Sequence, residues 1–145
     1  MTVVVQRVTG ASVTVDGKTV GSAGRGLMIL IGVRNGDAAA AADFLAAKCA
    51  ALRVFPDESG KMNLSLADID GEALVISQFT LLGDCSKGRR PNFMEAAPAE
   101  LARELYEYFV KKLRQQVRKV ETGIFGADMK VQLTNDGPVT IIINS

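Results

Sequence analysis

The sequence predicts a single α/β domain over residues 1–145, with a mixed, barrel-like β-sheet and two main helices in the order ββ-β-α-β-α-βββ. The chain is long enough for one well-buried domain and too short for two. Its composition, 48% apolar and 23% charged, is that of a globular protein. Short β-rich runs alternate with two segments of helical pattern, which is typical of a sheet covered by helices.

The N-terminal third begins with strands. Residues 2–16 are rich in Val and Thr and are interrupted by a glycine, so they predict one bent strand or two short ones. Asp16 and Gly17 are a two-residue turn signal, after which residues 18–22 return antiparallel. Residues 27–33 are apolar at nearly every position, as expected of a central strand covered on both faces.

A helix and a mixed segment come next. Gly36 ends the buried strand, and Asp37 offers an N-cap to a helix that continues through an alanine-rich run to about Leu52. Residues 53–72 carry several turn signals and predict no long element. Residues 73–82 predict another strand.

The second half predicts one helix and three strands. A polar loop at 83–92 precedes a helix that begins at Pro98 or Ala99 and ends near Gln116. Its apolar residues recur at every fourth position, which indicates a stripe facing the sheet. The stripe consists of Leu101, Leu105, Phe109 and Leu113. The last strands are expected at 117–120, 129–134 and 139–144.

Composition restricts the chemistry. The chain has no histidine, which excludes a Ser-His-Asp or Cys-His hydrolase and a His-based zinc site. The net charge of +1 excludes a chain-wide polycationic nucleic-acid binder but permits a local basic patch. Cys49 and Cys85 are isolated, which suits a reducing compartment. Without a signal-peptide pattern or an apolar run near 20 residues, we expect a cytoplasmic protein with no membrane span.

The first candidate site is SQFTL at residues 77–81. In a continuing strand, Ser77 and Phe79 share one face, and Gln78 and Thr80 share the other. The simplest interpretation is a strand end whose hydroxyls cap a turn. The functional interpretation is a small polar cleft, with backbone N–H groups near Phe79 that stabilise a developing oxyanion. A Ser77 or Thr80 nucleophile is less favoured, because no histidine is present to act as its base.

The second candidate site is NDGPVT at residues 135–140. The pattern alone favours a tight turn that joins two terminal strands. The alternative is a cis bond between Gly137 and Pro138, since a cis peptide costs little only before proline. A cis bond would point consecutive carbonyl oxygens in similar directions and make a rigid acceptor pair for an ammonium group, which Gly137 allows to approach closely.

Weaker features are interpreted structurally. The glycine-rich residues 21–26 precede a strand rather than a helix, so the context of a phosphate-binding loop is missing. The cations at 111–119 are explained by the helix dipole and by solvation. The cations at 87–90 permit a phosphate contact. Phe125, between two glycines, is a packed loop aromatic by default or else a platform for base stacking.

Together these segments resemble the D-aminoacyl-tRNA deacylase family over nearly the whole chain. SQFTL and NDGPVT at this separation form a specific joint signature, which neither segment forms alone. The other matching residues are Arg7, Val8, Ala11, Ser12, Val13, Gly26, Leu27, Lys87, Gly88, Arg89, Arg90, Pro91, Phe93, Thr122, Gly123, Phe125, Gly126, Ala127 and Met129.

The resemblance implies a homodimeric, cofactor-free and metal-free enzyme of translation quality control. It would hydrolyse the ester between a D-amino acid and the terminal ribose of tRNA. In the family the Gly-Pro bond is cis and enters the partner subunit's pocket, so Gly137 and Pro138 would hold the substrate's α-amino group through main-chain oxygens. An L-substrate would clash there, whereas glycine has no side chain to clash. Glycyl-tRNA is therefore an expected secondary substrate.

The resemblance also places Ser77, Gln78, Phe79 and Thr80 in the pocket, with the N–H groups of Phe79 and Thr80 facing the ester oxygen. The terminal adenosine's 2′-hydroxyl would help to activate water, so that the protein mainly positions and stabilises. Thr80 as nucleophile is an alternative of lower rank. The residues expected to border the terminal adenine are Phe125 and Met129.

Two other functions stay open at this point. A related deacylase would clear a small L-amino acid from a mismatched tRNA, with a trans Gly-Pro bond. A non-catalytic module would bind tRNA ends or replication machinery.

Overall fold

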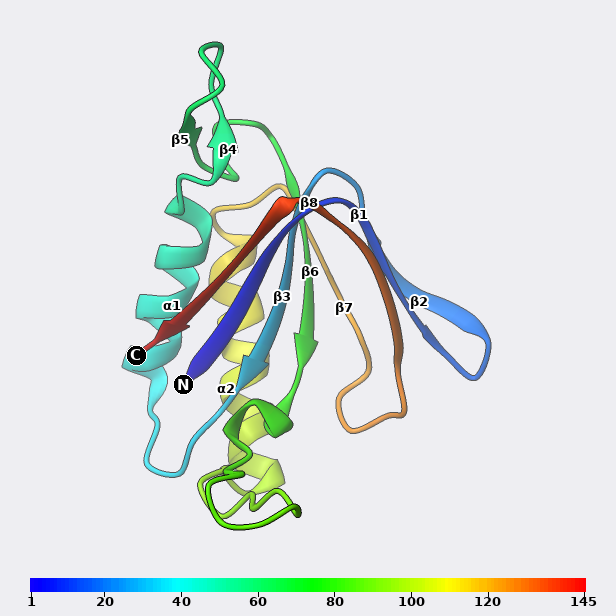
Figure 1. Cartoon of the computed structure of the whole chain (residues 1–145), viewed down its shortest axis with the longest axis vertical. Coiled ribbons are helices and arrows are strands. Elements are labelled where there is room, and N and C mark those ends of the chain that lie inside the picture. Colours follow the sequence, from blue (N-terminus) through cyan, green and yellow to red (C-terminus); the bar gives the residue numbers. More distant parts are fainter.

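The computed structural model describes all 145 residues and contains one six-stranded mixed sheet, a two-stranded hairpin and two α-helices (Figure 1). The fold is a single α/β domain with a barrel-like sheet, as the sequence predicts. The strands of the sheet are β1 (Thr2–Val15), β2 (Lys18–Ala23), β3 (Gly26–Gly32), β6 (Glu72–Ser77), β7 (Lys119–Thr122) and β8 (Lys130–Asn144). The other elements are α1 (Ala39–Ala51), α2 (Ala99–Arg114), the hairpin strands β4 (Phe55–Pro56) and β5 (Met62–Leu64), and the 3₁₀ turn η1 (Phe79–Leu82).

The sheet has the order β2-β1-β3-β6-β7, and β8 pairs with β1. β3, β6 and β7 are parallel to one another, and the other pairs are antiparallel. β1 and β8 bend together, so that the first half of β1 pairs with β3 and its second half pairs with β2 (Figure 1). β2 also lies close to β7. The distance is so short that a side chain at Gly21 would collide with the carbonyl oxygen of Thr122. The sheet is therefore nearly closed.

Both helices cover the same face of the sheet (Figure 1), and the main hydrophobic core lies between them and the strands. The predicted stripe of α2 is confirmed, since Leu105, Phe109 and Leu113 are buried there. Each fully buried side chain of this size contributes roughly 1.5–3 kcal/mol to stability. A smaller cluster, which includes Val8 and Ile76, is separate from the main core. No helix is both long and apolar enough to cross a membrane.

The prediction that Asp37 caps the first helix is wrong. α1 begins at Ala39, and its N-cap, Ala38, makes no side-chain hydrogen bond. The Asp37 carboxylate is already occupied, because one oxygen accepts from the N-terminal ammonium at 2.7 Å and the other from the Arg34 N–H at 2.6 Å. The N-terminus also donates to the Ser145 hydroxyl at 2.6 Å, so these bonds join both chain ends to the start of α1.

The prediction of one strand over residues 73–82 is wrong in its second half. β6 ends at Ser77, and residues 79–82 form η1. The last bond to the neighbouring strand is donated by the Gln78 N–H to the Ile31 carbonyl at 2.8 Å. Because β3 itself ends at Gly32, no strand remains to pair with, and the chain turns.

The interpretation of residues 135–140 as a turn between two strands is also wrong. The two predicted strands at 129–134 and 139–144 form the continuous strand β8, and both halves pair antiparallel with β1. Irregular register between Gln6 and Gly10 of β1 accommodates the motif at the bend. The Gly137–Pro138 bond is cis.

Candidate active site

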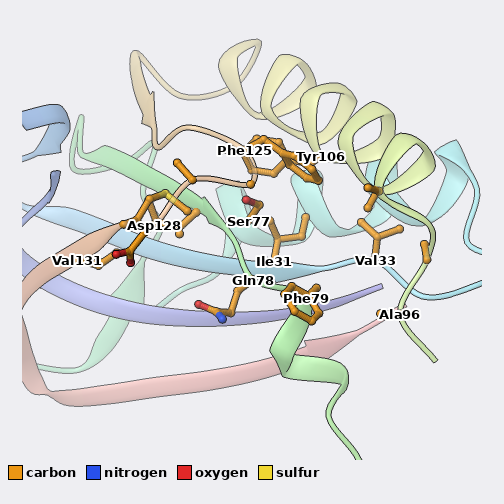
Figure 2. A pocket seen from close by; sticks show the side chains of 17 residues that line it. Ile31, Val33, Ser77, Gln78, Phe79, Ala96, Tyr106, Phe125, Asp128 and Val131 are labelled. Atoms are coloured by element: carbon orange, nitrogen blue, oxygen red, sulfur yellow. The ribbon is translucent and has the colours of Figure 1, made fainter. Parts of the chain in front are cut away.

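A partly enclosed cavity of about 550 Å³ lies where the parallel strands β3 and β6 reach their carboxyl ends. This edge is the usual ligand-binding position of parallel sheets. The start of α2 and the segment 125–131 complete its wall. Figure 2 shows Phe125 and Tyr106 on one side of the space, and Gln78 and Phe79 on the other.

Small side chains keep the cavity open. Ala96, Ala97, Ala99 and Ala102 line it at the start of α2, where larger residues would fill the space. The segment that leads into α2 is fixed to the end of β3, since the Ala97 N–H donates to the Val33 carbonyl at 2.9 Å. Sequence reasoning missed these alanines, because alanine before a helix also satisfies helix propensity and gives no separate signal.

The turn after β6 forms the polar side of the cavity. Ser77, Gln78 and Phe79 line it, whereas Thr80 is exposed and lies outside the lining. The Gln78 side-chain amide donates to the Thr80 hydroxyl, so Thr80 still contacts the lining through Gln78. Phe79 is 56% exposed and packs edge-on against Phe93, with 5.1 Å between ring centroids.

The backbone of this turn carries N–H groups that lack an acceptor. The first N–H groups of any helical turn have no partner within it. Outside the helices and sheet ladders, no hydrogen bond uses the N–H of Phe79 or Thr80, although Gln78 and Leu81 on either side both donate. Two adjacent N–H groups are therefore without an acceptor, and the first belongs to Phe79, which lines the cavity.

The opposite wall is aromatic and rests on α2. The Phe125 ring lies 5.9 Å from the Tyr106 ring and 5.1 Å from the Arg103 guanidinium carbon. The Tyr106 hydroxyl donates to the Val75 carbonyl at 3.0 Å. Burial raises the pKa of Tyr106 to about 12, so the phenol stays protonated at neutral pH. Nothing in the sequence distinguishes Tyr106 from the other residues of the apolar stripe.

Met129 is part of this wall because Gly123 leaves room for its side chain. A side chain at Gly123 would collide with the Met129 sulfur, so the glycine lets Met129 lie over it. At the rim, the Asp128 carboxylate forms an ion pair with the Lys130 ammonium at 3.0 Å. Of the eight residues predicted for the site, Ser77, Gln78, Phe79, Phe125 and Met129 line the same cavity.

Gly137 and Pro138 lie elsewhere. Both are exposed, and neither lines the cavity. The bend of β1 and β8 that carries them is at the opposite end of the sheet from η1 (Figure 1). The partly buried Arg7 fixes this bend, because its Nε donates to the Asp136 carbonyl at 3.0 Å and its Nη1 to the Val54 carbonyl at 2.7 Å. The sequence flagged Arg7 only as a matching residue, without a role.

The comparisons with known proteins agree over the full chain. The family model described as D-Tyr-tRNA(Tyr) deacylase matches residues 4–144. A D-aminoacyl-tRNA deacylase of Geotalea uraniireducens is 59% identical over all of this chain and 94% of its own length. Another, of Caldicellulosiruptor bescii, is 58% identical over all of this chain and 97% of its own length.

Two solved structures share the fold. One, named c-Myc DNA Unwinding Element Binding Protein, has a TM-score of 0.95 and 44% identity, and the match covers 100% of this chain and 99% of the other. The second, described as a probable eukaryotic D-amino acid tRNA deacylase, has a TM-score of 0.85 at 20% identity, with both chains covered completely. The second likeness concerns the fold alone.

Fold, pocket and relatives together define a hydrolase of the D-aminoacyl-tRNA deacylase class. The chain belongs to the D-Tyr-tRNA(Tyr) deacylase family.

Proposed function

We propose that two copies of this chain form an enzyme that hydrolyses the ester of D-aminoacyl-tRNA, and that main-chain atoms of Gly137 and Pro138 reject L-aminoacyl substrates. The separation of the two motifs carries this proposal. Ser77 and Phe79 line the cavity, whereas Gly137 and Pro138 are exposed outside it. If Gly137 and Pro138 contribute to a pocket, that pocket belongs to a second subunit, because they do not reach their own.

The face of the sheet that points away from the helices supports a dimer. Val4 pairs with Leu30 on one side and with Ile142 on the other, so the three side chains form an apolar row across three strands. Their neighbours Val3, Val5 and Ile31 point into the main core, so the row points away from the helices. Ile142 is 65% exposed in the single chain. An isologous contact between two copies would cover this row.

The chemistry proposed for the pocket is positioning and electrostatic stabilisation. The available N–H groups of Phe79 and Thr80 would bind the ester carbonyl oxygen as negative charge develops on it. Ser77 and Gln78 would orient the substrate, and Phe125 and Met129 would border the terminal adenine. Thr80 as nucleophile has less support, because its hydroxyl accepts from Gln78 outside the cavity lining.

The proposed base is part of the substrate. Among the lining residues, the Tyr106 phenol is held neutral and Asp128 is bound by Lys130 at the rim. The 2′-hydroxyl of the terminal adenosine would instead help to activate water, which attacks the carbonyl carbon and releases the D-amino acid and tRNA.

The experiment compares release of D-tyrosine, L-tyrosine and glycine from charged tRNA by the purified protein. We expect release of D-tyrosine and glycine and retention of L-tyrosine. Selective release of an L-amino acid would support the related L-specific deacylase. No release at all would support a binding module, a function that the name of the 44% identical structure also indicates.

The same assay on tRNA that ends in 2′-deoxyadenosine tests the role of the 2′-hydroxyl. We expect a large loss of turnover there, and full activity would exclude substrate assistance. A cytoplasmic location stays a prediction of the sequence.

A further inference from the structure

The loop between Asp84 and Asn92, here called the basic loop, carries Lys87, Arg89 and Arg90 without a partner for any of them. Most Lys and Arg side chains of the chain contact a carboxylate, a carbonyl or an aromatic ring. No such contact exists for the three cations of the basic loop, all of which are exposed. The other cations without a contact lie far from one another in the sequence: Lys18, Lys61 and Lys111.

The basic loop is attached to the cavity. Asp84 and Asn92 close it through two backbone hydrogen bonds of 2.8 and 2.9 Å. Phe93, the next residue, packs against Phe79, which lines the cavity. In Figure 1 the segment lies beyond η1, at the same end of the sheet as the carboxyl ends of β3 and β6. The three cations are therefore presented next to the cavity rather than elsewhere on the surface.

The chemistry of the basic loop fits phosphate groups of a nucleic-acid backbone. Arg presents a planar fork of donors that matches phosphate, and Lys adds a point charge. Asp84 is its single carboxylate, and that group accepts the Ser86 N–H at 2.8 Å. Residues 84–92 contain no aromatic side chain on which a base could stack. These features favour contact with the backbone over readout of bases.

The size of the cavity indicates where that backbone lies. About 550 Å³ is the volume of a site for one small molecule, so it suits the aminoacylated terminal nucleotide, and the rest of a tRNA must lie outside. We propose that the basic loop binds the phosphodiester backbone of the single-stranded acceptor end, immediately 5′ of the nucleotide in the cavity. This inference rests on the proposed function and adds the surface that distinguishes a tRNA from a free aminoacyl nucleoside.

The test compares two substrates and two triple variants. The loop variant is Lys87→Ala/Arg89→Ala/Arg90→Ala, and the matched control, Lys18→Ala/Lys61→Ala/Lys111→Ala, removes the same charge elsewhere. For D-tyrosyl-tRNA, we expect kcat/KM of the loop variant to fall about tenfold or more at low salt. The slope of log KM against log salt concentration should become shallower by roughly 2. Hydrolysis of D-tyrosyl-adenosine should not change, and the control should behave like the wild type with both substrates.

Several results would overturn the inference. Equal losses with tRNA and with D-tyrosyl-adenosine would mean that the loop acts on the pocket itself. Equal losses in both triple variants would mean that only the overall charge matters. An unchanged salt dependence in the loop variant would exclude phosphate contacts.

Binding of uncharged tRNA, measured at several salt concentrations, separates this inference from the proposed function. If the wild type hydrolyses neither D-substrate, the proposed function fails. Weaker tRNA binding by the loop variant alone would still support the basic loop, and equal binding by all three proteins would refute it. The charge-retaining Arg89→Lys/Arg90→Lys variant should keep most of the salt dependence, which controls for damage to the fold.

Discussion

The segment 77–80 and the segment 135–140 both carry polar side chains, but one follows the end of a strand and the other lies inside one. The first leaves its strand beside a cavity of its own subunit, and its Phe79 and Thr80 N–H groups have no acceptor. The second stays within β8 and is exposed at the other end of the sheet.

The supports of the two segments also differ. The turn at 77–80 is held by the hydrogen bond from Gln78 to the Ile31 carbonyl and by the contact of Phe79 with Phe93. The Gly-Pro segment is held by the partly buried Arg7, which donates to the carbonyls of both Asp136 and Val54. The separation of the cavity from the exposed Gly-Pro segment is the reason for proposing that two copies act together.

The largest effect is expected from Pro138→Ala. Proline fixes φ, and alanine releases the segment that would meet the substrate's α-amino group. We expect the preference for D- over L-tyrosyl-tRNA to fall by about 100-fold, or turnover to be lost, because a small displacement of a positioning group has effects of this size. Pro56→Ala, in the β4–β5 hairpin, is the control, and unchanged enantioselectivity in Pro138→Ala would count against a role of the segment.

Arg7→Met should have the next largest effect. It leaves the Asp136 and Val54 carbonyls without their charged donor, at a cost of about 1.5–3 kcal/mol. Loss of position in the Gly-Pro segment should lower kcat/KM about tenfold under conditions where the variant is folded. Arg7→Lys should retain only part of the function, since an ammonium cannot reproduce the fork that reaches both carbonyls. Urea unfolding and D-tyrosyl-tRNA kinetics test this, and normal kinetics in Arg7→Met would show that the segment needs no anchor.

Tyr106→Phe should affect stability more than activity. It removes the hydrogen bond to the Val75 carbonyl, at a cost of about 1 kcal/mol or a melting temperature lower by roughly 2–4 °C. Because burial raises the pKa of Tyr106 from 10.0 to about 12, its contribution is complete below pH 10 and is lost as pH rises from 10 towards 12. The wild type should therefore lose its advantage over Tyr106→Phe in urea unfolding at alkaline pH. A constant difference between pH 8 and pH 12 would contradict the assignment.

The smallest effect is expected from Asp43→Asn, which is remote from both segments. Asp43 accepts from Lys112 at 3.0 Å and from the Tyr108 hydroxyl at 3.1 Å, and the Lys112 hydrogen bond chiefly lowers the pKa of the Asp43 carboxyl. Such an exposed pair contributes little. Its contribution is present above the unfolded pKa and is lost as pH falls below it, so the slight difference from wild type should vanish in acid. Kinetics should be unchanged, and an altered enantioselectivity would show that remote surface changes reach the site.

The sequence predicts those parts of the fold that depend on local patterns. Asp16 and Gly17 both have positive φ, as a two-residue hairpin turn requires. The apolar run at 27–33 is a buried central strand, and the fourfold spacing in α2 gives its buried stripe. In each case neighbours in the sequence determine the outcome.

The errors arise where distant parts of the chain decide. Residues 79–82 leave the strand because β3 ends beside them, and residues 135–140 continue β8 because both of its halves find the same partner strand. Asp37 fails as a cap because the N-terminal ammonium, far away in the sequence, binds its carboxylate. The joint signature predicts residues that line the cavity, such as Ser77 and Phe125. The placement of Gly137 and Pro138 in a partner's pocket follows from the family resemblance and from no local pattern, and it stays a prediction.

A subunit-mixing experiment tests whether the two segments act across a dimer. One variant, Gln78→Ala/Phe79→Ala, lacks the pocket, and the other, Pro138→Ala, lacks the rejecting segment. Each should show little D-selective deacylation when purified alone. If each pocket uses its partner's segment, each mixed dimer has one complete site of two. Co-expression should therefore restore roughly one quarter of wild-type sites in the whole mixture, and about half in mixed dimers isolated through two affinity tags. No recovery in isolated mixed dimers would contradict the exchange between subunits.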